Sequence, residues 1–174
     1  MNKTNSNKFL RAALLALAVA APSTLPAQTW QTVDDFQYTL GHHSFAFGCG
    51  ADGLGNFYVA GRGQDSANLN HALVMRSSDA GATWQTIQDY TYPSATATGF
   101  VSIGIDSAQN LYALGSATFT TGGTHWLVRK SAYLGNGTWA AWQTVDDFQY
   151  ATGWSSGAST GLAEDSSGNL YIAG

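Results

Sequence analysis

The chain is poor in charge and in basic residues, and this shortage excludes several classes of partner. Only 10% of its 174 residues are charged, and seven basic residues face eleven acids. Binding to nucleic acid needs clustered Lys and Arg that displace counterions, and the sequence contains no such cluster. An anionic membrane surface is disfavoured for the same reason. We therefore expect no nucleic acid and no charged membrane surface among its partners.

Cysteine is almost absent, since Cys49 is the only one. An intramolecular disulfide is therefore impossible, and Cys49 lacks the Cys and His companions of a zinc site. We expect Cys49 to be a small buried residue in a strand. The fold must then depend on its core and on the stacking of repeated units, and we expect no cofactor.

The N-terminal segment 1–27 has the order of a secretory signal peptide. Lys3, Lys8 and Arg11 form a basic start, residues 12–21 form an apolar run, and Ala27 is a small residue at a plausible cleavage point. This apolar run is too short to span a bilayer, which needs about 20 residues. The alternative is an N-terminal helix lying on a membrane. We expect a chain secreted to the medium or the bacterial periplasm, with no membrane insertion after cleavage. Cleavage would change the net charge from −4 to −7, because four basic residues then face eleven acids.

One phrase occurs three times, beginning at Trp30, Trp84 and Trp142. The first and third copies read Trp-Gln-Thr-Val-Asp-Asp-Phe-Gln-Tyr, and the three starting positions are almost evenly spaced. A repeat of this length indicates one structural unit that is copied along the chain. The repeat defines the architecture without identifying the function.

Each repeat reads as four short strands. The segments near 45–51, 57–62, 71–77 and 83–89 are rich in Val, Ile, Tyr, Phe and Trp and are bounded by turn residues. Asp-x-x-Gly-Asn sequences predict turns, because Asp and Asn cap the backbone locally. No apolar period of 3.6 residues persists, so we expect almost no helix. Four antiparallel strands in each repeat predict an all-β fold of β-propeller blades.

The count of blades predicts an open propeller. Within the repeat region 28–174 we expect an isolated outer strand at 29–37, blades at 45–90 and 100–148, and a half blade at 158–174. A propeller closes with about 4–8 blades, whereas this chain has about two and a half. We therefore expect it to need further blades or self-association.

An eight-residue motif links the repeat to a known family. The motif runs Ser77-Ser-Asp79-Ala-Gly81-Ala-Thr83-Trp84 and resembles the Asp-box of bacterial neuraminidase repeats, which also occurs in sortilin-like propellers. The resemblance implies a structural hairpin, with Asp79 and Gly81 in the turn and Trp84 packed beneath it, and no catalytic role. The Asp-x-x-Gly-Asn-x-Tyr blocks also resemble a bacterial β-propeller repeat of secreted multidomain proteins.

The resemblance leaves a fragment of a sialidase-like glycoside hydrolase as the alternative function. That family implies an arginine triad, a tyrosine nucleophile with a glutamate partner, and an acidic aspartate. Arg62, Arg76 and Arg129 fall on or beside outer strands and are not expected to converge. Glu164, the only glutamate, occupies a repeat position just before a turn aspartate. We expect no catalytic residue in this chain.

A metal site is not predicted. The pair His42-His43 has no nearby acidic or cysteine ligand, and each Asp-Asn turn offers fewer oxygens than the 6–8 that calcium takes. His71 and His125 are repeat equivalents, so we expect them on different blades in a shared structural role, such as bonding to neighbouring backbone. The paired acids at 146–147 point to opposite faces of a strand and are expected at a solvated edge.

Aromatic loop residues are the candidate ligand contacts. Tyr90, Tyr92, Tyr150 and Trp154 could stack on sugar rings or peptides, or could pack between blades. We take Tyr92 and Trp154 as candidate contacts for a glycan or protein ligand. The expected function is a secreted or cell-surface repeat protein with a structural or ligand-binding role and no catalysis.

Overall fold

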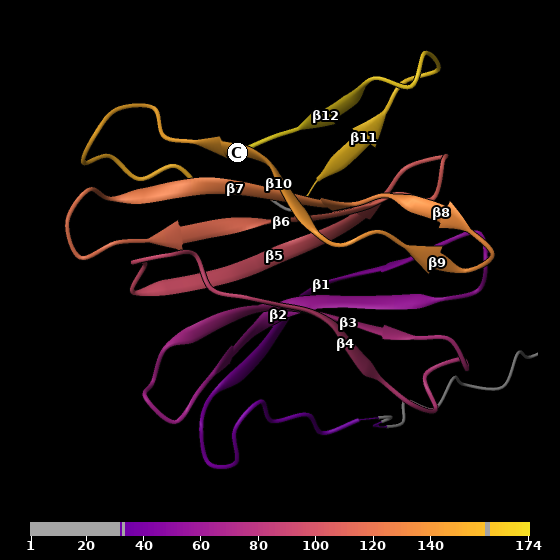
Figure 1. The fold of residues 1–174 in the computed structure, drawn as a ribbon, viewed down its shortest axis with the longest axis horizontal. Helices are drawn as coiled ribbons and strands as arrows, with labels where there is room; N and C mark the ends of the chain where they lie inside the picture. Colours follow the sequence, from indigo (N-terminus) through magenta and orange to yellow (C-terminus); the bar gives the residue numbers. More distant parts are fainter. Residues whose placement is uncertain (1–31, 33, 159–160) are drawn as a thin grey trace, which may run out of the picture. The chain divides into compact units, whose positions relative to one another are not determined.

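The computed structural model describes residues 32, 34–158 and 161–174, and these residues form strands and no helix (Figure 1). The all-β prediction is therefore confirmed. The described part of the chain accordingly contains no helix long and apolar enough to cross a membrane. The predicted signal peptide 1–27 lies outside the described residues. Four of the nine residues of the predicted outer strand 29–37 also lie outside them, and its described residues, 32 and 34–37, are not in a strand.

Four strands form a first antiparallel meander, in which each strand pairs with the next in the chain. They are β1 (Ser44–Ala51), β2 (Phe57–Gln64), β3 (Asn70–Ser77) and β4 (Gln85–Tyr90). Their bounds lie within two residues of the predicted strands. The prediction that the short segments between turn residues are strands is therefore confirmed. Along each strand, side chains alternate between two faces.

A second meander repeats the same order and pairing. Its strands are β5 (Ala97–Ile105), β6 (Leu111–Thr118), β7 (Thr124–Ser131) and β10 (Gln143–Phe148). One parallel bridge, Asn70 to Ala97, connects β3 with β5, so the two meanders are counted as one mixed sheet.

Two hairpins complete the described structure. The first, β8 (Tyr133–Gly135) with β9 (Thr138–Trp139), is inserted before β10, and Tyr133 stands at the repeat position of Asp79. The second, β11 (Leu162–Glu164) with β12 (Leu170–Ile172), is the terminal hairpin. The terminal hairpin repeats only the first two strands of a meander.

The turn between the first two strands of each unit is built by one aspartate. Asp52 Oδ1 accepts from the Asn56 backbone N–H at 2.8 Å, and Asp52 Oδ2 accepts from the Tyr58 hydroxyl at 2.8 Å. The predicted local capping by aspartate is therefore confirmed. The same contacts recur twice, in the sets Asp106, Asn110, Tyr112 and Asp165, Asn169, Tyr171.

Each of the two meanders buries the same one of its two faces against the unit that follows it in the chain. The first meander contributes Tyr58, Ala60 and Val74 to a core that it shares with the second meander. The counterparts of these residues, one repeat further along the chain, pack against the terminal hairpin; they are Tyr112, Leu114 and Val128. We call this the forward face of each unit, and the opposite face the back face. The apolar interface between units is therefore formed twice.

Cys49 lies in β1, as predicted, but the prediction that it is buried is wrong. Its counterpart in the second meander is Ile103, which is buried because the first meander covers the back face there. Among the described residues, no unit of the same kind covers the back face of the first meander. Burial of this position is decided by the neighbouring unit and not by the strand itself.

Candidate functional site

A cluster of tyrosine, histidine and aspartate occurs once in each meander. In the first meander, the Tyr38 hydroxyl donates to Asp89 Oδ2 at 2.7 Å, and His71 Nδ1 lies 2.7 Å from Asp89 Oδ1. In the second, the same roles fall to three counterparts: Tyr92, His125 and Asp147. Each tyrosine lies in the segment that enters a meander, and its partners lie on the outer two strands. The cluster therefore ties the incoming chain to the outer strands.

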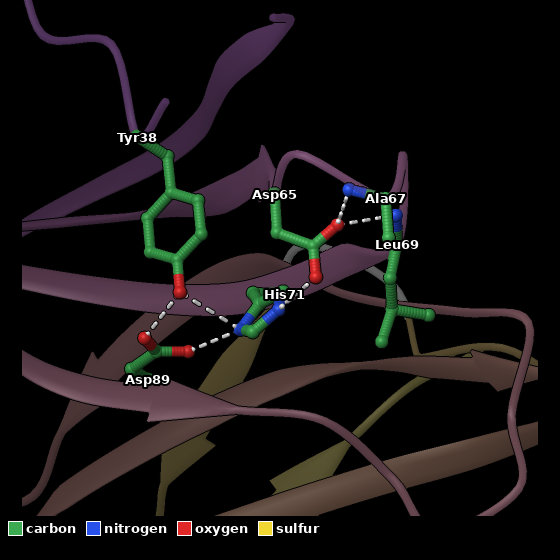
Figure 2. A network of polar contacts seen from close by, with 6 residues as sticks. All are labelled: Tyr38, Asp65, Ala67, Leu69, His71 and Asp89. Atoms are coloured by element: carbon green, nitrogen blue, oxygen red, sulfur yellow. Dashed lines mark hydrogen bonds and ion pairs between the residues drawn. The ribbon is translucent and has the colours of Figure 1, made fainter. Parts of the chain in front are cut away.

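The first cluster contains a second carboxylate (Figure 2). Asp65, in the loop between β2 and β3, places Oδ2 3.4 Å from His71 Nε2. Its other oxygen accepts from the backbone N–H groups of Ala67 and Leu69. The bond from Leu69 is the main reason that the pKa of Asp65 lies below its usual value. Each ring nitrogen of His71 therefore lies beside a carboxylate, Nδ1 beside Asp89 and Nε2 beside Asp65.

The second cluster replaces that acid with an aromatic ring. Phe119 occupies the repeat position of Asp65, and its ring centroid lies 4.9 Å from that of His125 and 5.3 Å from that of Tyr92. His125 keeps one carboxylate, with Nδ1 2.9 Å from Asp147 Oδ1. The two clusters thus share one architecture and differ in local charge.

The two tyrosine hydroxyls are held in their protonated form. Burial and the bond to Asp89 raise the pKa of Tyr38 to about 12. The bond to Asp147, together with burial, raises the pKa of Tyr92 to about 12. A hydroxyl that donates to a carboxylate is stabilised as a donor, because ionisation would place two negative charges side by side. These tyrosines are suited to holding structure and poorly suited to nucleophilic attack.

Tyr150, the counterpart of Tyr38 and Tyr92 in the third copy of the Trp phrase, lies in different surroundings, beside Trp154. Tyr150 donates its backbone N–H to Ser156, as Tyr38 does to Ser44 in the first repeat. Its side chain is 76% exposed, that of Trp154 is 64% exposed, and their ring centroids lie 6.0 Å apart. Gln149 Nε2 donates to the Trp154 carbonyl at 2.7 Å. The result is an exposed aromatic pair on an anchored loop.

The predicted ligand contacts therefore occupy different surroundings. Tyr92 is half-buried within the second cluster, with its hydroxyl already bonded to Asp147. Its ring packs against those of Phe119 and His125, whereas the exposed ring of Trp154 packs against Tyr150. Tyr92 and Trp154 thus belong to separate aromatic clusters.

Residues of the motif 77–84 form a closed hydrogen-bonded turn. Asp79 Oδ1 accepts from the Thr83 backbone N–H at 2.8 Å, and Asp79 Oδ2 accepts from the Thr83 hydroxyl at 2.6 Å. Ser77 donates to Asp79 and accepts from the Gly81 N–H, each at 2.8 Å. Trp84 is half-buried and lines a cavity of about 360 Å³ on the back face of the first meander. These polar contacts are local to the turn and suit a structural role.

We expect the Asp79 carboxylate to support the fold above pH 4 and to lose that effect toward pH 2. Hydrogen bonds from Thr83 and Ser77 lower its pKa from 3.8 to about 2. A group with a lowered folded-state pKa contributes stability that disappears as pH falls through that value. Asp79→Asn should lower the urea midpoint at pH 7 and have a smaller effect at pH 2.5. The exposed Asp146→Asn variant is the control, and an effect of Asp79→Asn that does not vary with pH would contradict this assignment.

The arginines considered for a substrate carboxylate have separate structural partners. Arg62 lies over the rings of Phe45 and Phe47, with 5.1 and 5.6 Å from Cζ to the centroids. The other two lie over the rings of the aromatic residues Trp139 (Arg76) and Tyr90 (Arg129). The carboxylate of Glu164 accepts from the N–H and hydroxyl of Ser107 at 2.7 Å. Within the described ranges, no group of three or more His, Cys, Asp and Glu side chains could hold a metal ion.

Sequence reasoning identified the two histidines and missed their partners. His71 and His125 were expected to bond to backbone, but each faces an aspartate carboxylate. The signal was present in the repeated Trp phrase. Tyr38 and Tyr92 both end a copy of that phrase, and Asp89 and Asp147 both hold its sixth position.

No model of a known protein family matches the chain, and a search of curated proteins finds no match.

Proposed function

We propose that this chain is an exported repeat protein of the β-propeller type, with a structural and ligand-binding role and no catalysis of its own. The supporting observation is that Tyr58 and Tyr112 occupy equivalent buried positions in two successive unit interfaces. A unit whose forward face fits the back face of the next copy is suited to serial repetition. On this proposal the meanders are blades, and the chain carries about two and a half of them.

The aromatic pair Tyr150–Trp154 is the proposed ligand contact. Exposed aromatic rings can bind the apolar face of a sugar or a peptide side chain, since they bury large areas at little entropic cost. Gln149 restrains the loop through the Trp154 carbonyl, so the ring needs less ordering on binding. The ligand class is a glycan or a protein segment, and no acid–base or metal chemistry is needed.

Glycan and peptide arrays with the full chain test this proposal. We expect Trp154→Ala to weaken binding about tenfold, equal to about 1.4 kcal/mol. Leu40→Ala, at a residue that is also highly exposed, is the control and should bind like the wild type. Equal binding by wild type and Trp154→Ala would remove the aromatic pair from the site.

The sialidase-like alternative rests on the Asp-box resemblance alone. A tyrosine nucleophile must ionise, and neither Tyr38 nor Tyr92 is placed for this, since each donates to a carboxylate. Purified protein should leave a fluorogenic sialoside intact. Hydrolysis that follows the protein through purification would replace our proposal with the enzyme.

A further inference from the structure

Among the described residues, no unit of strands covers the back face of the first meander, whereas the first meander covers the back face of the second. In the second meander, Phe100, Ile103 and Leu111 lie on the back face and are buried by the first meander. The equivalent positions in the first meander hold Ala46, Cys49 and Phe57, and all three are exposed. The difference is large, since Leu111 is 1% exposed and Phe57 is 44% exposed.

The terminal hairpin has the complementary property on its forward face. Tyr58 and Tyr112 are 0% and 6% exposed, because the next unit covers each of them. Their counterpart Tyr171 makes the same hydrogen bond to its turn aspartate, Asp165, yet it is 58% exposed. Residues on the forward face of the terminal hairpin and on the back face of the first meander are therefore both exposed.

Two buried donors lie on the back face of the first meander. Among the described residues, Trp84 Nε1 and Arg62 Nε are buried without a hydrogen-bond partner, and both residues line the cavity of about 360 Å³. In the second meander the counterpart Trp142 donates its Nε1–H to the Ile87 carbonyl of the preceding unit at 3.1 Å. The cavity is also lined by Asp34, Asp35 and Phe36 of this chain, and within the described residues Trp126 Nε1 and Arg129 Nε are unpartnered in the same way, so these donors do not identify the neighbour.

We propose that the back face of the first meander binds the terminal hairpin of a second copy of this chain, head to tail. This inference rests on the proposed repeat architecture. The intrachain interface is the template, since its forward-face tyrosine recurs as Tyr171 and its back-face positions recur at Ala46, Cys49 and Phe57. The contact joins two different surfaces, so each copy in a joined pair keeps one of these two surfaces available for a further copy. Such a contact builds rings or open chains and does not stop at a twofold dimer.

Cys49 provides a direct test, because it is exposed and is the only cysteine in the chain. The full chain, labelled at Cys49 with a benzophenone maleimide and irradiated at rising concentration, should cross-link to the peptide 161–174 of another copy. Isotope-labelled and unlabelled copies mixed before irradiation distinguish contacts between copies from those within one. A product within one chain, including one to residues 1–31, would overturn the proposal.

Sedimentation of the unlabelled protein gives the second measurement. Wild type should form species that grow with concentration, and Phe57→Lys and Tyr171→Lys should each weaken association at least tenfold. An equimolar mixture of the two variants retains one intact pair of faces and should form a 1:1 complex. Leu134→Lys, at an exposed site on β8, is the control. A wild-type monomer at all concentrations would overturn head-to-tail docking, whereas glycan binding through Trp154 would survive it.

Discussion

Gly115→Ala is expected to destabilise the protein by about 3 kcal/mol, because overpacking of a tight backbone contact costs about 1–3 kcal/mol or more. A Cβ at position 115 would overlap the Gly99 carbonyl oxygen and crowd the Phe100 backbone. These atoms belong to β5, the strand paired with β6 at that point, where the register shifts between Phe100 and Ser102. No flexible side chain is available to move aside, so the strand pair itself must shift.

Urea unfolding followed by far-UV circular dichroism measures this effect. Gly61→Ala in β2 should behave in the same way, because a Cβ there meets the Phe45 carbonyl oxygen of β1. Gly161→Ala is the matched control, since nothing lies within 4 Å of its added Cβ. A Gly115→Ala midpoint equal to that of the control would show that the close approach of the two strands is not required.

Phe100→Ala is expected to cost about 3–5 kcal/mol, the usual range for truncating a buried phenylalanine. Phe100 is fully buried in the core between the two meanders. Its counterpart Ala46 occupies the same place in a strand of the same kind, so alanine is compatible with the backbone there. The loss therefore reports packing between units and not strand formation.

Thermal or urea unfolding of Phe100→Ala and Phe148→Ala provides the comparison. Phe148 lies on β10 with about half of its side chain exposed, and its truncation should cost less than about 1 kcal/mol. Equal losses for the two variants would mean that the interface between the meanders contributes little to stability.

Local features of the fold could be predicted from the sequence because their causes are local. The strands β1 to β4 lie within two residues of the expected segments, since turn residues bound each one. The turn at Asp52 followed from the same reasoning, because its carboxylate reaches backbone and side-chain donors between Leu54 and Tyr58. Interactions of such short range depend little on the rest of the molecule.

The candidate site was only partly predictable. The repeat placed His71 and His125 in equivalent roles, but the pairing with Asp89 and Asp147 needed the strand register. Asp147 lies exposed on the edge strand β10, as the sequence suggests, but its bonds from Tyr92 and His125 were not predicted. A strand sequence shows which residues share a face, whereas the partner across the sheet depends on long-range pairing.

The sequence by itself determined the unit of this protein: four short strands, an aspartate turn and the regular spacing at which both recur. Tertiary structure decided which copies of each position are buried. Cys49 and Ile103 occupy the same repeat position, as do Tyr58 and Tyr171, but in each pair one residue is buried and the other is exposed. The physical reason is that burial between units requires a neighbouring unit, and a repeated sequence does not specify which of its copies has one.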